Sequence, residues 1–361
     1  MTDLPSGLMK TLPLHEFKLP TAVLGFELHP GGERGFAACH DGIYELDIKD
    51  GKAQKLYAHE SYASGVVCLP DGNTLVSSGY DGALRWLDLR TRQVMRTVAA
   101  HRFWSWQLAR SNDGTKVASV TGQYLCGGTQ YEPGPQQEPS VRVYDTKDGA
   151  CLFSFDHTPP VLSVAFSPEG RFIAAGNMMG EVRVWDLLDG QQVSTWNTPS
   201  FTSWGVIKSH HYIGGIFSLV FAPDSNSILA AGMGPMNDPM AGNGKQTWQR
   251  FLWRETPVKK SGEIQETDQG NGLMESLALH PSKPWFVMAG RMAQGKWNTA
   301  IFSLENGSLL HSLDSKIRVT RASFDKAGGH LILAGASGQE RKKDGAYPEY
   351  GRVKVYRVAE A

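Results

Sequence analysis

The sequence predicts an all-β fold, a seven-bladed β-propeller made of four-stranded antiparallel blades. Two repeated signals support this prediction: a strand that ends in an acidic or polar residue, and a tight turn rich in Gly, Pro and Asp. Each signal occurs seven times along the chain. A repeat of about 40 residues is typical of propellers, in which each unit supplies one blade.

The strand signal includes VRVYD at 141–145 and VRVWD at 182–186. The seven strand signals end at Asp47, Asp88, Asp145, Asp186, Arg254, Ser303 and Arg357. The seven turns begin at His29, Leu69, Ser111, Ser167, Ala222, His280 and Asp325. Residues 161–193 show one complete unit, with the runs VLSVAF, RFIAAG, EVRVWD and QQVSTW separated by turn residues. Short runs rich in β-branched and aromatic residues between such turns indicate strands.

The ends of the chain are expected to close the ring. The last unit ends in KVYRVAEA without a fourth strand, and the spacing of Gly7 and His15 repeats that of Gly149 and His157. We therefore predict that residues 8–15 form the outer strand of blade 7, within one propeller domain over residues 1–361. Closure of this kind removes the open edges of the sheet.

The repeat resembles the WD-repeat (WD40-like) propeller family. The resemblance covers the whole chain and rests on a His before a new blade, a DG turn and a terminal Trp-Asp pair. It implies that a His, a Ser or Thr, an Asp and the Trp form a structural hydrogen-bond network within a blade. The residues that match these positions are His15, His59, His101, His157 and Trp185.

The signature of the family is degenerate in this chain. Met179 stands at an Asp position, and Trp86 and Leu87 stand in swapped order. Tyr144 and Tyr356 replace Trp. No unit carries the complete signature, so function is sought where the repeat is interrupted.

Composition excludes several classes of protein. The 36 basic residues balance the 36 acidic residues, which argues against a nucleic-acid or anionic-membrane partner. The first residues lack the apolar core of a signal peptide, so a cytoplasmic protein is expected, monomeric by itself. The cysteines are widely spaced without a CxxC pair, which indicates reduced thiols rather than a disulfide frame or a zinc site. They are Cys39, Cys68, Cys126 and Cys151.

The inserted length falls on one face of the predicted ring. Loops between the second and third strands, and segments from a fourth strand to the next blade, open on the same face, which we call the elaborated face. The long insertions are 123–140, 197–215, 233–247 and 336–350. The opposite, tight-turn face carries the short turns. Long loops on a rigid scaffold are typical of binding sites, and neutral loop growth is the alternative.

Aromatic residues gather on the elaborated face, and they predict a protein- or peptide-binding surface. The aromatic residues there are Phe103, Trp104, Trp106, Tyr124, Tyr131, Phe201, Trp204, Tyr212, Trp248, Trp297, Tyr347 and Tyr350, with Arg102, Arg291, Arg318, Arg321 and Arg341 nearby in sequence. Some of these rings are expected to pack between blades. The candidate binding residues are Trp204, Tyr212, Trp248, Trp297 and Tyr347, with Arg291 and Arg341 as polar anchors.

A metal-binding or small-molecule-sensing propeller is one alternative. The run MGPMNDPM carries three methionines, and His210 and His211 lie in another long insertion. Thioether and imidazole groups suit Cu(I), although methionines also serve as adaptable packing. The candidate ligands are Met233, Met236, Met240, His210 and His211. The expectation is a protein without a metal or cofactor.

A propeller enzyme with its site at the central channel mouth is the other alternative. The sequence has no GxSxG, HExxH or P-loop motif. The side chains that would have to converge are Glu132, His211, Asp238 and Asp344. The sequence therefore favours a non-catalytic scaffold, with no catalytic residue assigned. The basic run at 341–343 would suit an acidic peptide or a phosphate, although a solvated loop tip is expected there.

Overall fold

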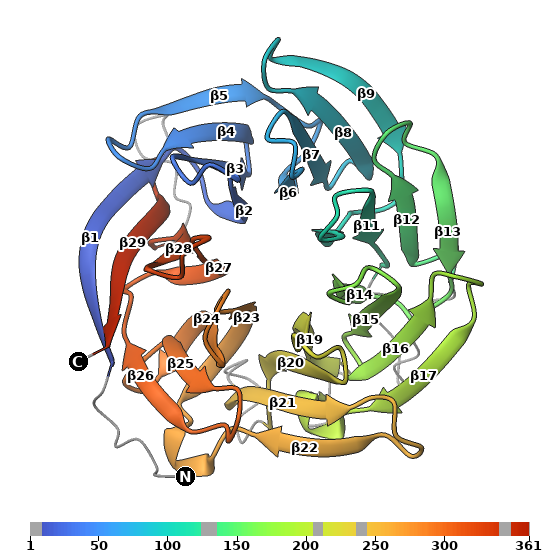
Figure 1. Ribbon diagram of the computed structural model, residues 1–361, viewed down its shortest axis with the longest axis vertical. Helices are drawn as coiled ribbons and strands as arrows, with labels where there is room; N and C mark the ends of the chain where they lie inside the picture. Colours follow the sequence, from blue (N-terminus) through green and yellow to red (C-terminus); the bar gives the residue numbers. More distant parts are fainter. Residues whose placement is uncertain (1–8, 124–135, 205–211, 236–243, 339–347, 361) are drawn as a thin grey trace.

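The computed structural model describes residues 9–123, 136–204, 212–235, 244–338 and 348–360. They form seven antiparallel sheets arranged in a ring, which confirms the predicted propeller (Figure 1). Blade 1 consists of β2 (Val23–Leu28), β3 (Arg34–Cys39), β4 (Gly42–Asp47) and β5 (Ala53–Tyr57). Blade 2 consists of β6 (Ala63–Cys68), β7 (Thr74–Gly79), β8 (Ala83–Asp88) and β9 (Gln93–Ala99).

The next blades repeat this order from the channel outward. Blade 3 consists of β10 (Gln107–Arg110), β11 (Lys116–Val120), β12 (Val141–Asp145) and β13 (Cys151–Phe155). Blade 4 consists of β14 (Val161–Phe166), β15 (Phe172–Asn177), β16 (Glu181–Asp186) and β17 (Gln192–Asn197). Blade 6 consists of β23 (Asn271–Leu279), β24 (Trp285–Gln294), β25 (Thr299–Ser303) and β26 (Leu309–Leu313).

Blade 5 departs from the predicted four strands. Its sheet has five, because the inner strand extends beyond the ring and pairs with a short extra strand that follows the 3-10 turn η1 (Pro199–Phe201). The strands are β18 (Thr202–Trp204), β19 (Tyr212–Phe221), β20 (Ser227–Met233), β21 (Gln246–Leu252) and β22 (Lys259–Glu263), and the 3-10 turn η3 (Glu266–Asp268) follows. Ser227 pairs with Leu252, so the strand signal of this blade ends two residues before Arg254.

Blade 7 closes the ring with the N-terminal strand, as the sequence predicted. Its sheet order is β1–β29–β28–β27, from the rim to the channel. The strands are β1 (Met9–Leu19), β27 (Arg318–Phe324), β28 (His330–Ala336) and β29 (Gly351–Glu360). The closing strand is longer than the predicted 8–15, because it pairs with the whole of β29, from Met9 opposite Glu360 to Leu19 opposite Gly351.

The core lies between the blades. Clusters of buried apolar side chains fill each interface between neighbouring sheets. The swapped Trp-Leu order in blade 2 shows how strand alternation assigns residues to an interface. Trp185 packs toward blade 3, whereas Trp86 points to the other face of its sheet and also packs toward blade 3.

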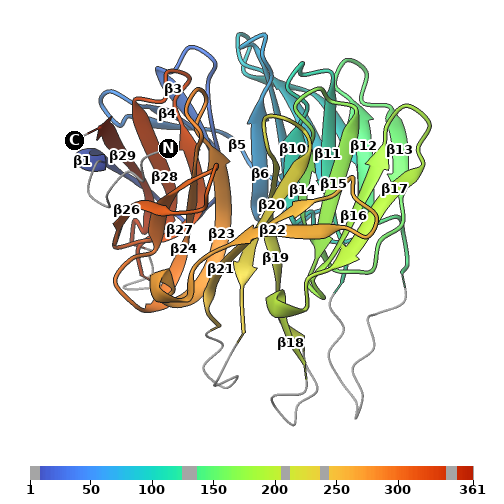
Figure 2. The ribbon, with the colours of Figure 1, turned by 60° about the horizontal axis from the view of Figure 1, so that its bottom comes forward.

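Inner strands are linked across blades by side chains. The Ser276 hydroxyl oxygen accepts from the Ala322 amide (2.9 Å), and the Gln107 side-chain oxygen accepts from the Val164 amide (2.7 Å). These bonds fix neighbouring blades around the channel. The short strand β18 and the adjoining end of β19 extend beyond the ring on its elaborated face (Figure 2).

Among the described residues, no helix is long and apolar enough to cross a membrane. Cys39 and Cys68 are buried free thiols, and Cys151 is an exposed one. Cys126 lies outside the described residues.

Candidate functional site

A row of aromatic rings runs along the elaborated face from blade 1 to blade 3. His40 lies in the turn between β3 and β4, and Tyr80 lies in the equivalent turn of blade 2. The other rings come from the segments that lead into blades 2 and 3. We call the six residues the aromatic row: His40, Tyr62, Tyr80, Phe103, Trp104 and Trp106.

The rings of the row touch one another. His40 stacks on Tyr62 with ring centroids 4.1 Å apart, and Tyr62 lies 5.9 Å from Tyr80. Tyr80 stacks on one face of Trp104 at 4.5 Å, and Phe103 stacks on the other at 5.0 Å. Tyr62 and Trp104 remain 43% and 40% exposed, so the row presents apolar surface to solvent although its rings are held in place.

Hydrogen bonds on both sides fix the segment that carries Trp104 and Trp106. The Ser105 amide donates to the Gly79 carbonyl oxygen (3.2 Å) in blade 2. On the blade 3 side, the Thr121 hydroxyl donates to the Trp104 carbonyl oxygen (2.8 Å), and the Trp106 indole N–H donates to the Gly122 carbonyl oxygen (3.0 Å). A segment bound in this way loses little conformational entropy when a partner docks.

The row borders the mouth of the central channel. A cavity of about 190 Å³ opens there, and every blade contributes to its wall. We call this cavity the channel mouth. Its lining includes Leu24, Tyr80, Trp106, Leu162, Phe217, Glu275 and Arg318. Tyr80 and Trp106 belong to both the row and the mouth, so the two form one continuous surface.

The charged groups that line the mouth come from blades 6 and 7. Arg318 binds Glu275 through two contacts, Nε to Oε1 at 2.7 Å and an NH2 nitrogen to Oε2 at 2.8 Å. Hydrogen bonding to Glu275 raises the pKa of Arg318. Arg321 lies three residues further along β27 and also lines the mouth. Burial lowers the pKa of Arg321, and burial raises the pKa of Tyr80 across the channel.

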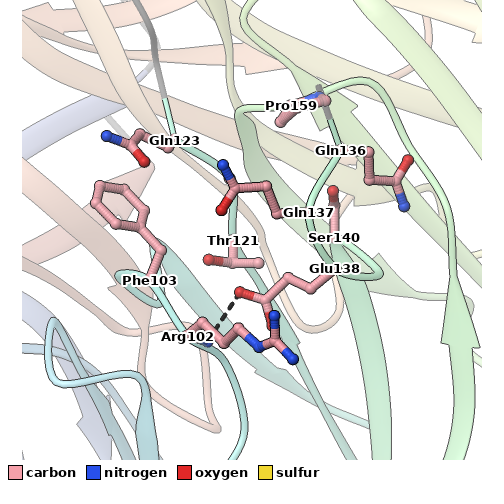
Figure 3. Close-up of a pocket in the computed structure, with 10 residues that line it drawn as sticks. Arg102, Phe103, Thr121, Gln123, Gln136, Gln137, Glu138, Ser140 and Pro159 are labelled. Atoms are coloured by element: carbon pink, nitrogen blue, oxygen red, sulfur yellow. Dashed lines mark hydrogen bonds between the residues drawn. The ribbon is translucent and has the colours of Figure 1, made fainter. Parts of the chain in front are cut away.

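A second, smaller hollow lies beside the row on blade 3. It has a volume of about 100 Å³ and is lined mainly by polar side chains, including Gln123 and Gln137 (Figure 3). The Glu138 carboxylate accepts from the Arg102 amide (2.8 Å), and it lies 3.3 Å from Arg142. Phe103 lines this hollow as well, so the row has a polar border at its blade 3 end.

A larger hollow of about 690 Å³ lies between blades 7 and 1 on the opposite side of the ring. It is open, and its wall is formed by short turns such as 30–33 and 325–327, together with His15 from the closing strand. His15 is exposed there and stacks on Phe17. It does not take the network position of the family, where Leu19 stands four residues before β2.

Among the described residues of blades 2, 3 and 4, only blade 2 joins a His, a Ser and an Asp, and the Trp of the network is missing there because Trp86 points to the other face of the sheet. His59 contacts the Asp81 carboxylate (3.0 Å) and the Ser77 hydroxyl (2.7 Å). Burial of Asp81 opposes its ionisation, but hydrogen bonds from His59 and two amides outweigh it and lower the pKa of Asp81 to about 2. These residues are buried within the blade, which agrees with a structural role.

In blades 3 and 4 no Asp stands at the position of Asp81, although the Glu181 carboxylate lies 3.8 Å from Nδ1 of His157. His101 contacts the Ser119 hydroxyl (2.9 Å), and His157 contacts the Ala175 carbonyl oxygen (3.3 Å). Burial lowers the pKa of His101 to about 3 and that of His157 to about 4. In blade 4 the side chain of Asn177 holds the turn instead, accepting from the Met179 amide (3.0 Å).

Two of the aromatic residues predicted to bind a partner are core residues. Trp248 is 2% exposed and Trp297 is 6% exposed, and both pack between blades 5 and 6. Trp248 lies edge-on to Phe286 and Phe302, with centroids 5.0 and 5.7 Å away. The correction follows from strand alternation, which turns Trp248 into the interface between the blades.

Of the other predicted anchors, the structure describes Arg291 and the backbone of Trp204 and Tyr212. Trp204 pairs with Tyr212 through the backbone of the extra hairpin of blade 5, and their side chains lie outside the described part. Arg291 is exposed near the end of β24. Tyr347 and Arg341 lie outside the described residues, as do Tyr124 and Tyr131.

His40, Tyr62 and Tyr80 were not predicted as site residues, because they lie in short segments rather than long insertions. The signal was an aromatic ring before Asp-Gly at equivalent turns, in HDG at 40–42 and YDG at 80–82. Two neighbouring blades with a ring at the same turn position place those rings on one face, and Tyr62 contacts both of them. The prediction of the binding residues was based on the long insertions and did not use this turn pattern.

For the metal alternative, the described residues contain no cluster of three or more His, Cys, Asp or Glu side chains that suits a metal ion. Met233 is buried at the end of β20. Met236, Met240, His210 and His211 lie outside the described residues. Glu132, Asp238 and Asp344, named for the enzyme alternative, also lie outside the described residues.

Comparison with known proteins bears on the family. The family model for the WD domain, G-beta repeat, matches residues 51–88 and 149–186. Over 148 residues the chain is 26% identical to WD repeat-containing protein SL1-17 of Schistosoma mansoni, a match that covers 41% of this chain and 44% of that protein.

Two further relatives align with segments of different length in this chain. Pre-mRNA-processing factor 19 of Dictyostelium discoideum is 29% identical over 252 residues, 69% of this chain and 43% of that protein. Small ribosomal subunit protein RACK1 of Schizosaccharomyces pombe is 26% identical over 141 residues, 36% of this chain and 40% of that protein. The chain thus spans less than half the length of these relatives. The chain is therefore a seven-bladed propeller that contains two matched WD repeats and is similar to WD-repeat proteins.

Proposed function

We propose that this propeller is a non-catalytic scaffold that binds a partner protein or peptide through its elaborated face, with the aromatic row as the docking surface. The observation that carries the proposal is that Tyr62 and Trp104 are exposed although each ring is fixed by stacking. Rigid aromatic side chains are the usual anchors of protein interfaces, because they bury large area at low entropic cost.

The close spacing of the rings favours partner binding at this row over binding through scattered contacts. Interface aromatics contribute on the order of 2 kcal/mol each when a partner buries them. Tyr62 and Trp104 lie on neighbouring blades with Tyr80 between them, so one short segment of a partner contacts both. The polar hollow at the blade 3 end, with Gln123 and Gln137, supplies hydrogen-bonding groups at the border of the row.

The relatives support a role in assemblies. One of them is, by its name, a protein of the small ribosomal subunit. The balanced charge of this chain, 36 basic and 36 acidic residues, favours a protein partner over nucleic acid.

Affinity capture from the native host tests the proposal. The wild-type protein is compared with the double variant Tyr62→Ala/Trp104→Ala and with Leu188→Ala. Leu188 is the matched control, because it is an apolar side chain, 78% exposed, in the turn between β16 and β17 on the tight-turn face.

We expect the same partner to be captured by the wild-type protein and by the Leu188 variant, and to be lost from the double variant while its melting curve stays unchanged. A folded double variant that captures every partner of the wild type would remove the aromatic row as the docking surface.

A further inference from the structure

We propose that the bound segment inserts one carboxylate side chain, an Asp or a Glu, into the channel mouth, where Arg321 binds it. This inference rests on the proposed docking of a peptide on the aromatic row. It adds the chemical class of the partner, an acidic peptide, and the residue that selects it.

The first step is the charge balance of the channel mouth. Both oxygens of Glu275 are engaged by Arg318, at 2.7 and 2.8 Å. Arg321 makes no ion pair within the described part of the chain. Arg321 Nη1 donates a hydrogen bond to the Thr320 carbonyl oxygen (3.0 Å). This bond uses one of the five N–H donors of the guanidinium group. The mouth therefore holds two cations and one carboxylate.

The second step is the environment of that unpaired cation. The wall of the cavity around Arg321 includes the apolar side chains of Leu24, Leu162 and Phe217. Such walls weaken solvation and strengthen a contact between opposite charges. Arg321 is partly buried. A cation held partly away from water without a counter-charge is costly, and an incoming carboxylate offsets that cost.

The third step is the path from the row to the cavity. Tyr80 stacks on Trp104 and also lines the mouth, and Trp106, which lies edge-on to Trp104 at 5.4 Å, lines it from blade 3. A segment lying on the exposed rings therefore passes the rim of the cavity. The cavity of about 190 Å³ is several times the roughly 30 Å³ share of one liquid water, so a carboxylate side chain fits.

The fourth step is the choice of anion. One unpaired guanidinium matches the single charge and planar shape of a carboxylate, which it binds through two parallel hydrogen bonds. The described residues bring no second unpaired cation to this cavity, whereas a phosphate dianion favours a cluster of basic groups. The adjacent apolar row also suits a peptide better than a free ion.

The test uses a random-peptide display library selected on the full chain. The sequences of the selected peptides are read, and the affinities of the best binders are measured for the wild type and for four variants. These are Arg321→Gln, Arg321→Lys, Glu275→Gln and Leu188→Ala, each with its melting temperature. Inorganic phosphate is added as a competitor in a separate series.

We expect selected peptides to share an Asp or Glu next to an apolar residue. Arg321→Gln should weaken their binding by on the order of tenfold or more, as for loss of a charged hydrogen-bond pair, and Arg321→Lys should recover part of it. Glu275→Gln should strengthen binding, because it frees the charge of Arg318. Unfolding cannot produce such a gain, and Leu188→Ala should change nothing.

Several outcomes would overturn the inference. Peptides that need Trp104 but lack an acidic residue, or that bind Arg321→Gln as tightly as the wild type, would leave the docking surface intact and remove the carboxylate site. Displacement by millimolar-range inorganic phosphate alone would reassign the cavity to a free anion. A selection that yields no peptide dependent on Trp104 would overturn the proposed function and this inference with it.

Discussion

The two faces of the ring use their side chains in opposite ways. On the tight-turn face, polar side chains form hydrogen bonds within their own turns. The Asp71 carboxylate, for example, accepts from the amides of Asn73 (2.8 Å) and Thr74 (3.0 Å). On the elaborated face, Tyr62 and Trp104 keep exposed rings, and Arg321 has no ion pair within the part of the chain that the structure describes. The difference shows where the fold has completed its own hydrogen bonding and where it leaves groups for another molecule.

The comparison also separates two kinds of aromatic residue. Trp248 is enclosed by its own blades, whereas Trp104 is held by Tyr80 and Phe103 and still faces solvent. The same residue type is therefore a packing element in one place and an available contact surface in the other. Each prediction below alters one side of this contrast, starting with the change that should affect stability most.

Removing residues 1–16 should destabilise both faces together. The deletion removes most of β1 and leaves the paired edge of β29 exposed along its length. We expect the melting temperature to fall by more than about 10 °C, since even a few kcal/mol shift it by several degrees. Thermal unfolding followed by circular dichroism measures this, and an unchanged melting curve would contradict closure by the N-terminal strand.

Trp248→Ala and Trp104→Ala should have opposite consequences. Loss of the buried Trp248 ring should lower the free energy of unfolding by about 3–5 kcal/mol. Trp104→Ala should cost less than about 1 kcal/mol, because its ring is partly exposed, yet it should weaken partner binding. Chemical denaturation of the two variants side by side measures this, and equal losses of stability would remove the distinction between them.

The histidines of blades 3 and 4 should make stability depend on acid. Burial holds the pKa of His101 near 3 and that of His157 near 4, below the ordinary 6.5. The unfolded chain therefore takes up protons first, so stability is full above pH 6.5 and falls as the pH drops toward 4 and below. Each site contributes on the order of 3 to 5 kcal/mol to this loss once the pH lies below its pKa in the folded protein.

The control for this prediction is His157→Gln, which removes one titrating group. Denaturation midpoints of this variant should change less between pH 6.5 and 4 than those of the wild type. Identical pH profiles for the two proteins would show that His157 is protonated equally in the folded and unfolded states.

Shortening the insertions 123–140, 233–247 and 336–350 one at a time should have the smallest effect on stability. Changing the length of a surface loop alters its closure entropy by only about 0.6 kcal/mol for each doubling. We expect folded variants, at least one of which loses the partner. Folded variants that all retain every partner would make neutral loop growth the better explanation of the insertions.

The fold could be predicted because its signals are local and repeated. Strand alternation and turn chemistry recur in each blade, and the strand signals at Asp145 and Asp186 differ little. The candidate site was harder to predict. Tyr62 and Trp104 are 42 residues apart in sequence, and they come together because consecutive blades place the start of each inner strand on one rim.

The burial of Trp248 could not be predicted from the sequence either. Its position follows from the register of β20 with β21, in which Trp248 lies opposite Ala231. The length of the preceding loop hides that register in the sequence. The sequence also could not show that Arg321 lacks an ion pair among the described residues. That depends on the structure, in which Glu275 of the neighbouring blade binds Arg318 through both of its oxygens.

Site-specific photocrosslinking in the native host tests most directly whether the elaborated face is the binding face. The photoreactive residue p-benzoylphenylalanine replaces Tyr62 in one version of the protein and Leu188 in a second, since both positions are exposed and lie on opposite faces. We predict a covalent adduct with a partner from position 62 and none from position 188. An adduct from position 188 with none from position 62 would contradict the account.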